Sequence, residues 1–299
     1  MTMQLLAPIP PSEWPAEALL ARLRGRRAVL GRGDLNQEQE DSPEQVFLRE
    51  LTWVYRHLET KFRRTMQAYF EIVAMRQVNQ ALRYRLNGEP APQAFLRLEL
   101  LDRSLRQTFS VDQDPLELVN HLERSWSAWQ FVSGLSRQYL EQGPGGVEQQ
   151  LSCGILAQGL QDSKGVVRWF VMALIDLRNI LAVLKYWRWQ AKLAPQLLAG
   201  GNVSISKLKR IWRAQDRQQL GSVVGKVAGG NVAGSEPRQV ERIMLAGIGR
   251  QLHRYGRDPL SVAVVIDYLW RRHVAAQNQQ LRLLIGRDQQ ELLLEAMLP

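Results

Sequence analysis

Apolar residues recur along most of this chain at the spacing of one helical face. Between Phe47 and Met66 the intervals of three and four residues repeat over several turns. The apolar positions there are Phe47, Leu48, Leu51, Val54, Tyr55, Leu58, Phe62 and Met66. No stretch alternates apolar and polar residues long enough to predict a substantial sheet. The pattern therefore predicts an all-α protein, with a helix over 47–66.

Three predicted helix starts pair a capping residue with a proline, at Ser42-Pro43, Asp114-Pro115 and Asp258-Pro259. The capping side chain accepts a backbone N–H that the helix leaves unpaired, and a proline at the first helical position has no N–H to lose. Ser42 and Gln45 also have the spacing of a capping box. We expect a helix to begin at each of the three prolines.

Glycine-rich stretches predict the breaks between helices, because glycine and proline interrupt regular structure. They are Asn87-Gly88-Glu89-Pro90, Gly143-Pro144-Gly145-Gly146, Gly200-Gly201-Asn202 and Gly229-Gly230-Asn231. Residues 31–42 are polar and acidic, and we expect an exposed loop there.

A weak internal repeat has an offset of 100 residues, with 69–79 lying over 169–179. Both copies begin with an aromatic residue, continue through an apolar run and reach an asparagine, Asn79 or Asn179. Six residues later each meets a base, Arg85 or Lys185. The repeat predicts one helical unit used more than once.

The charge balance favours acidic partners. The chain carries 39 Lys and Arg against 29 Asp and Glu, a formal charge of +10, so nucleic acid, anionic lipid and acidic protein surfaces all fit. The single cysteine, Cys153, forms no disulfide within the chain and is interpreted as a buried small hydrophobe. The sequence predicts no membrane span and no signal peptide, and hence a cytoplasmic protein.

Two basic segments are candidate interaction surfaces. Residues 22–27 form the densest patch. The simpler interpretation is the solvated face of a helix, with Leu19, Leu20, Leu23 and Leu30 near the core. Residues 185–192 interleave aromatic and basic residues, which suits nucleobases or lipid headgroups. The simpler interpretation there is a long helix whose tryptophans are buried while its Lys and Arg reach water.

Enzyme motifs fail one by one. Gly221 to Lys226 is one residue short of a phosphate loop, and Val227 stands where Ser or Thr must hold magnesium. Gly247-Ile248-Gly249 follows a helical pattern, which a dinucleotide fingerprint does not. The four histidines, His57, His121, His253 and His273, lack metal-ligand spacing. We expect no catalytic residue, metal or cofactor, and interpret Asn79, Asp176 and Asn179 as structural polar residues inside apolar helices.

Three segments together carry a family resemblance. Residues 20–30 are similar to an opening helix with an Ala-Arg-Val-Arg element. Asp176, Asn179 and Lys185 match a pattern of an acid, an asparagine three residues on and a base six residues further, whereas the first copy has Arg76 in place of the acid. Residues 258–269 and 281–287 are similar to a C-terminal helix. In order and spacing these segments resemble the C-subunit family of prokaryotic V/A-type rotary ATPases, whose eukaryotic members form the V-ATPase d-subunit family.

The resemblance implies a funnel of three related helical bundles with pseudo-threefold symmetry, which we place at 12–110, 111–212 and 213–299. It implies a non-catalytic coupling subunit of the rotor on the cytoplasmic face of the membrane, as a peripheral protein. Its partners would be the ring of c (proteolipid) subunits and the shaft subunits D and F, with a contact to the membrane a/I subunit also allowed. The bases assigned to partner binding are Arg22, Arg24, Arg85, Lys185 and Arg282.

Two other interpretations stay open. A basic helical-repeat protein that binds nucleic acid would also explain the charge, as would a peripheral protein on an anionic membrane. The resemblance itself implies no nucleic acid. In the C-terminal helix, His273, Ala275 and Gln277 replace glutamates that the family usually carries.

Overall fold

The computed structural model describes residues 3–10, 12, 14–30, 42–229, 236–284 and 297. Its regular elements are helices, and the only β pairing in the described part is an isolated bridge between Leu6 and Leu101. The prediction of an all-α protein is confirmed. The chain divides into two compact units, the first formed by Met1–Glu13 and Leu48–Ser163, the second by Trp14–Phe47 and Lys164–Pro299.

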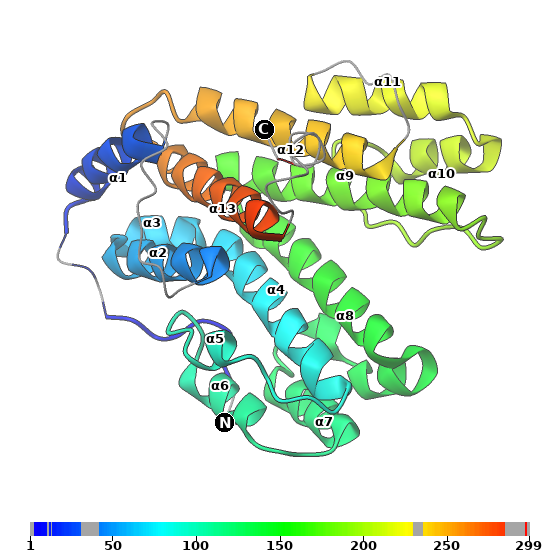
Figure 1. Cartoon of the computed structure of the whole chain (residues 1–299), viewed down its shortest axis with the longest axis horizontal. Coiled ribbons are helices and arrows are strands. Elements are labelled where there is room, and N and C mark those ends of the chain that lie inside the picture. The colour runs from blue at the N-terminus through cyan, green and yellow to red at the C-terminus, as the bar shows by residue number, and fades with distance from the viewer. Residues whose placement is uncertain are drawn as a thin grey trace. The chain divides into compact units, whose positions relative to one another are not determined.

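The first unit is built around two long helices, α4 (Gln67–Leu86) and α8 (Leu135–Asp162), which pack along each other (Figure 1). Arg83 of α4 makes a two-pronged ion pair with Glu148 of α8, at 2.8 and 2.6 Å. The shorter elements of the unit are most of α2 (Pro43–His57), then α3 (Thr60–Thr65), α5 (Gln93–Leu96), α6 (Arg103–Ser110), α7 (Pro115–Ser125) and the 3-10 turn η1 (Gln130–Val132).

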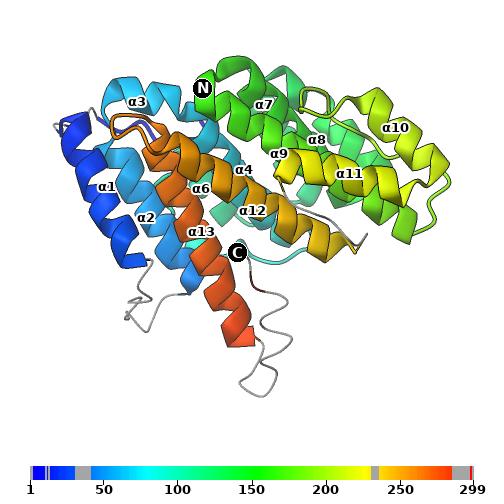
Figure 2. The same cartoon turned by 90° about the horizontal axis from the view of Figure 1, so that it is seen from above.

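The second unit combines an N-terminal helix with the C-terminal half of the chain. Its helices are α1 (Ala16–Leu30), α9 (Gly165–Arg188), α10 (Ile205–Ala214), α11 (Arg217–Ala228), α12 (Pro237–Tyr255) and α13 (Ala263–Leu284). Helix α1 packs against α13, and α12 lies between α13 and α9 in the pattern of contacts (Figure 2). Leu19, Leu20 and Leu23 of α1 are buried, as predicted, while the side chain of Leu30 lies outside the described residues.

Two of the three predicted helix starts are confirmed. Ser42 and Gln45 form the capping box at the start of α2, with each side chain bonded to the other residue's backbone N–H. Asp114 accepts from the N–H groups of Leu116 and Glu117 and begins α7 at Pro115.

The third predicted start is wrong by four residues. Asp258 accepts the N–H of Leu260 at 3.1 Å, but that interaction closes a turn, and α13 begins only at Ala263. The Ser261 hydroxyl accepts the N–H of Ala263 and takes over the capping role.

The predicted single helix over 47–66 is also wrong, because α2 ends at His57 and α3 begins at Thr60. Glu59 has the extended backbone angles φ −53° and ψ 146°, which break the helix. Leu58 and Met66 are fully buried on either side of the break. Local periodicity continues across the interruption, so it could not reveal the bend.

The predicted breaks differ in kind. Asn87-Gly88 and Gly200-Gly201-Asn202 lie in loops, and Gly229 ends α11 with φ +64°. At 143–146 the chain kinks α8 at Gly143, whose φ of 66° and ψ of −159° suit only glycine. Residues 31–41, most of the predicted acidic loop, and 230–235 lie outside the described residues.

The two copies of the repeat fall on the long helices α4 and α9. Cys153 differs from its prediction, because it is half-buried on α8 beside the buried positions Leu151 and Ile155. The three bundles at 12–110, 111–212 and 213–299, and their pseudo-threefold funnel, stay predictions.

Candidate functional site

Asp176 is a buried acid on α9 whose carboxylate bonds the loop that follows this helix. Its carboxylate is fully buried and accepts hydrogen bonds from the backbone N–H groups of Asn202 and Val203, at 2.9 and 3.0 Å, and from the Asn202 side chain at 2.8 Å. Burial raises the pKa of Asp176, although these hydrogen bonds oppose the shift. A Cβ at Gly201 would come within 2.2 Å of Asp176 Oδ1, so glycine is required there. Asp176 therefore holds the loop that follows α9.

Asn179 holds the same loop one turn further along α9. Its side-chain amide donates to Leu198 O at 2.8 Å, and its side-chain oxygen accepts from Leu198 N–H at 2.9 Å. The paired bonds reproduce the pattern of a backbone ladder and leave no buried amide atom of Asn179 unpaired. Asp176 and Asn179 thus both bond the loop that follows α9.

The equivalent positions of α4 behave differently. Asn79 donates to the Ser152 hydroxyl of α8 at 2.9 Å, and Arg76, in place of the acid, is exposed. Arg85 is only 7% exposed, and its guanidinium donates to Val111 O and Asp112 Oδ1, both at 3.0 Å. Arg85 therefore ties the end of α4 to the segment between α6 and α7.

The other four predicted contact bases differ in exposure. Arg22 is exposed with its guanidinium 5.3 Å from the Trp14 ring, whereas Arg24 is half-buried. Lys185 and Arg282 are exposed near the ends of α9 and α13. Within the second unit, the contact of α1 with α13 brings the helices of Arg22, Arg24 and Arg282 together, while Lys185 lies on α9.

An ion-pair cluster that the sequence did not predict centres on Asp267 of α13. The carboxylate is fully buried and accepts from Arg27 of α1 at 2.7 Å and from Arg271 at 3.0 Å. His253 Nδ1 of α12 lies 3.9 Å from Asp267 Oδ2 and 3.3 Å from the Arg271 guanidinium. The only signal in the sequence was one acid ending the apolar run 262–266, together with the arginine-rich opening helix. This cluster joins α1, α12 and α13.

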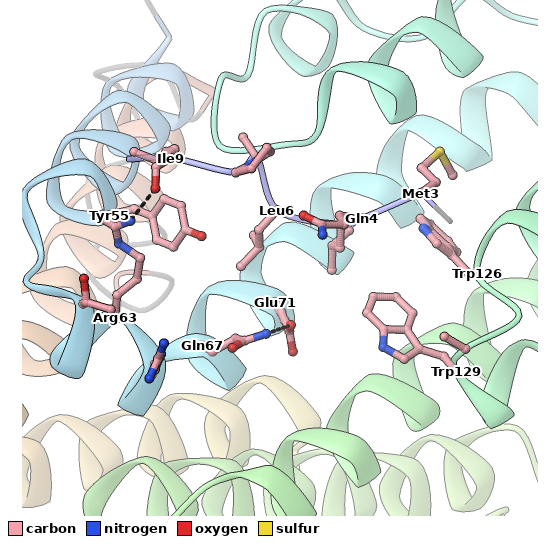
Figure 3. Close-up of a pocket in the computed structure, with 16 residues that line it drawn as sticks. Met3, Gln4, Leu6, Ile9, Tyr55, Arg63, Gln67, Glu71, Trp126 and Trp129 are labelled. Carbon is pink, nitrogen blue, oxygen red and sulfur yellow. Dashed lines mark hydrogen bonds between the residues drawn. The ribbon is translucent and has the colours of Figure 1, made fainter. Parts of the chain in front are cut away.

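A cavity of about 730 Å³ lies in the first unit, beneath the N-terminal segment 3–9 (Figure 3). Tyr55, Glu71, Trp126 and Trp129 line it, and Arg63 closes one side by donating to Ile9 O at 2.8 Å. Burial raises the pKa of Glu71, the nearby Asp162 adds to the shift, and the hydrogen bond from Gln67 opposes it. Glu71 can accept a proton or a polar group, but none of the lining residues is a histidine, serine or cysteine that Glu71 could activate.

The two glycine-containing segments that resemble nucleotide-binding motifs both lie inside helices. Gly221 to Lys226 lies inside α11, where the backbone N–H groups serve the helix, and Gly247-Ile248-Gly249 lies inside α12. Across the described residues no cluster of His, Cys, Asp and Glu has the geometry to hold a metal. No helix in the described ranges has the length and apolar character needed to cross a bilayer.

The comparison with protein families identifies the chain. Residues 37–278 match the model of the ATP synthase (C/AC39) subunit family. The chain belongs to this family. It is therefore a subunit of a rotary ATPase, as its motif order had indicated, and the matched range includes α2 to α12 and most of α13. No curated protein matches the chain.

The family match changes the meaning of the polar clusters. As a structural subunit, the protein needs helices held in fixed positions, and Asp176, Asn179 and Asp267 provide that by bonding loops and helices to one another. Asp176 and Asn179 stand out in the sequence because they interrupt apolar runs. The Arg27–Asp267 pair has no such local signal, because the partners are 240 residues apart.

Proposed function

We propose that this chain is the coupling subunit of the rotor, joining the shaft subunits D and F to the membrane ring of c subunits. Torque then passes between the ATP-driven head and the ion-carrying ring, so that ATP hydrolysis or synthesis is coupled to ion transport. The observation that carries the proposal is the family match over residues 37–278. The protein works on the cytoplasmic face of the membrane as a peripheral subunit and contributes no catalytic step.

The build of both units supports this role. A piece that transmits torque must resist deformation, and close-packed helices do so because protein interiors have low compressibility. Polar bonds add directional restraints, and the carboxylates of Asp176 and Asp267 are fully buried. Asp176 fixes the loop after α9, Asp267 fixes α1 to α13, and Arg83–Glu148 fixes α4 to α8.

The exposed bases are the proposed contacts to partner subunits. Arg22, Lys185 and Arg282 are exposed, and Arg24 is half-exposed beside Arg22 on α1. Exposed arginine and lysine suit acidic protein surfaces, where arginine also makes two-pronged bonds to carboxylates. Arg85 belongs to the same proposal, but its side chain already bonds Val111 and Asp112 within the first unit.

A pull-down with purified components tests the assignment. The immobilised chain should retain the D–F shaft and, separately, the detergent-solubilised c ring, and raised salt should weaken both contacts because exposed charges are screened. Retention of neither component at low salt would overturn the proposal. A nonspecific nucleic-acid affinity above the affinity for the shaft would favour the alternative, a basic helical-repeat protein.

A further inference from the structure

The ends of α9 and α10 lie together in the second unit. The loop after α9 runs back along that helix, because Leu198 bonds Asn179 and Val203 bonds Asp176. Helix α10 then follows the direction of α9 and packs against it (Figure 1).

One hydrogen bond fixes this arrangement at the far end. The Trp187 indole N–H donates to Trp212 O at 3.1 Å, which joins the last turn of α9 to the last turn of α10. The residues close to these two tryptophans in the sequence therefore occupy one end of the unit. We call this end the basic tip and define it as Arg188, Trp189, Lys192, Leu193, Arg210 and Arg213.

The charged residues of the tip are all basic. Between Asp176 and Asp216 the sequence holds eight Lys and Arg residues and no acid, although the whole chain has 29 acids among its 299 residues. All four bases of the tip are exposed. The negative end of the α9 dipole offsets only part of this charge.

The tip also exposes two large apolar side chains. Trp189 is 68% exposed and Leu193 is 80% exposed, so the predicted burial of the tryptophans in 185–192 is wrong for Trp189. Trp187, which bonds Trp212, is half-buried and remains part of the core contact between α9 and α10. Exposed apolar side chains are common on protein surfaces, but these two occur at the same end of the unit as four exposed bases.

We propose that the basic tip binds an anionic phospholipid surface, with Lys and Arg at the phosphates and Trp189 and Leu193 in the interfacial layer. Tryptophan prefers the depth of the headgroups, and basic residues gain from the negative surface potential. Nucleic acid would also use the bases and Trp189, but an aliphatic Leu193 adds nothing to stacking on a base. The proposal goes beyond the proposed function, whose partners are all proteins.

Flotation with lipid vesicles tests this surface without any other subunit. The full chain should float with vesicles of phosphatidylcholine and phosphatidylglycerol at about 7:3, and remain unbound with phosphatidylcholine alone. The triple variant Lys192→Gln, Arg210→Gln and Arg213→Gln should lower the partition coefficient by roughly a hundredfold, because each base near such a surface contributes about fivefold. Trp189→Ser with Leu193→Ser should lower it by roughly tenfold.

The matched control is the triple variant Arg97→Gln, Arg103→Gln and Lys164→Gln, which removes the same charge from exposed positions elsewhere. It should float like the unchanged chain, and an equal loss would show a net-charge effect and overturn the proposal. Normal flotation of the Trp189 and Leu193 variant would overturn it too. Tighter binding of the chain to single-stranded DNA than to the anionic vesicles would also overturn the proposal. Binding of the shaft subunits through the basic tip, without any binding to vesicles, would overturn it as well. Because shaft and ring are absent, failure here leaves the proposed coupling role standing.

Discussion

Gly247 of α12 is a residue whose role depends on close packing. A Cβ at this position would lie 2.6 Å from the carbonyl oxygen and 2.7 Å from the Cα of Ala228, at the end of α11. Arg250 donates to the same Ala228 oxygen at 2.7 Å, which further restrains it. The close approach of α11 and α12 therefore explains why residue 247 is glycine, and a dinucleotide-binding motif is not required to explain it.

Gly247→Ala should lower the free energy of unfolding by about 1–3 kcal/mol, because the added methyl meets backbone atoms that cannot yield easily. Gly25→Ala is the matched control, since Gly25 is helical in the same unit and nothing lies within 4 Å of its added Cβ. That change should stabilise the protein by about 0.5–1 kcal/mol. Urea unfolding measures both, and equal shifts of the same sign would contradict the packing explanation.

Glu123 is a residue that the sequence did not single out. Its carboxylate accepts the N–H groups of Gly134 and Ser136, at 2.6 and 2.9 Å, where α8 begins. Partial burial alone would raise the pKa of Glu123, but the hydrogen bonds from Ser136 and Gly134 outweigh burial and lower it. The donors come from residues beyond η1, so no local spacing marks Glu123 as a cap.

The lowered pKa of Glu123 gives a pH dependence with a definite sign. The folded state binds this proton less tightly than the unfolded state, so the stabilisation is present above the ordinary pKa and disappears as pH falls through the folded pKa. Glu123→Gln should cost about 1 kcal/mol at pH ~7 and progressively less below pH ~4. Thermal unfolding between about pH 3 and 7 measures this, with the exposed Glu89→Gln as control. A constant difference across that range would be inconsistent with the cap.

At the scale of elements, local chemistry predicted some boundaries and missed others. The capping side chains of Ser42 and Asp114 bond backbone groups two or three residues on, so their helix starts were predictable. The break at Glu59 was not predictable, because the apolar stripe continues across it, and the start of α13 was displaced by a turn at Asp258. The candidate site residues also differ in whether a local pattern in the sequence marks them. Asp176 interrupts an apolar run, whereas Asp267 gains its meaning from an arginine on a distant helix.

The attachment of α1 depends on Asp267. A 15-residue helix is marginal alone in water, so α1 relies on its buried leucines and on Arg27. Asp267→Asn should destabilise the protein by about 2–3 kcal/mol, because two arginines lose a buried partner. Hydrogen exchange should rise across 16–30 more than across α4. The control Asp112→Asn removes a fully exposed charge and should leave α1 protected. Unchanged protection of α1 in Asp267→Asn would refute this role.

At the scale of the whole molecule, the two repeat bases separate stability from assembly. Arg85→Gln should lower the melting temperature, since it leaves Val111 O and Asp112 without their donor. Lys185→Gln should leave melting nearly unchanged, because Lys185 is exposed, and should weaken retention of the shaft or ring at low salt. Differential scanning calorimetry and the pull-down measure both variants. If the Lys185→Gln variant assembles normally, Lys185 is not an interface residue. If Lys185→Gln lowers the melting temperature as much as Arg85→Gln does, both side chains have a structural role.

The proposed coupling role requires the chain to keep its shape while torque passes through it. The family match places the chain in a rotary ATPase, and the polar clusters hold its helices and loops in place. If the chain passes torque between shaft and ring, its removal must separate ATP hydrolysis from ion movement without affecting the catalytic head.

The most direct test is ATP-driven ion pumping by the rotary ATPase reconstituted in vesicles with and without this chain. The account predicts that omission abolishes pumping while the head still hydrolyses ATP, and that adding the purified chain restores pumping. Pumping at an unchanged rate per ATP hydrolysed in its absence would contradict the coupling role.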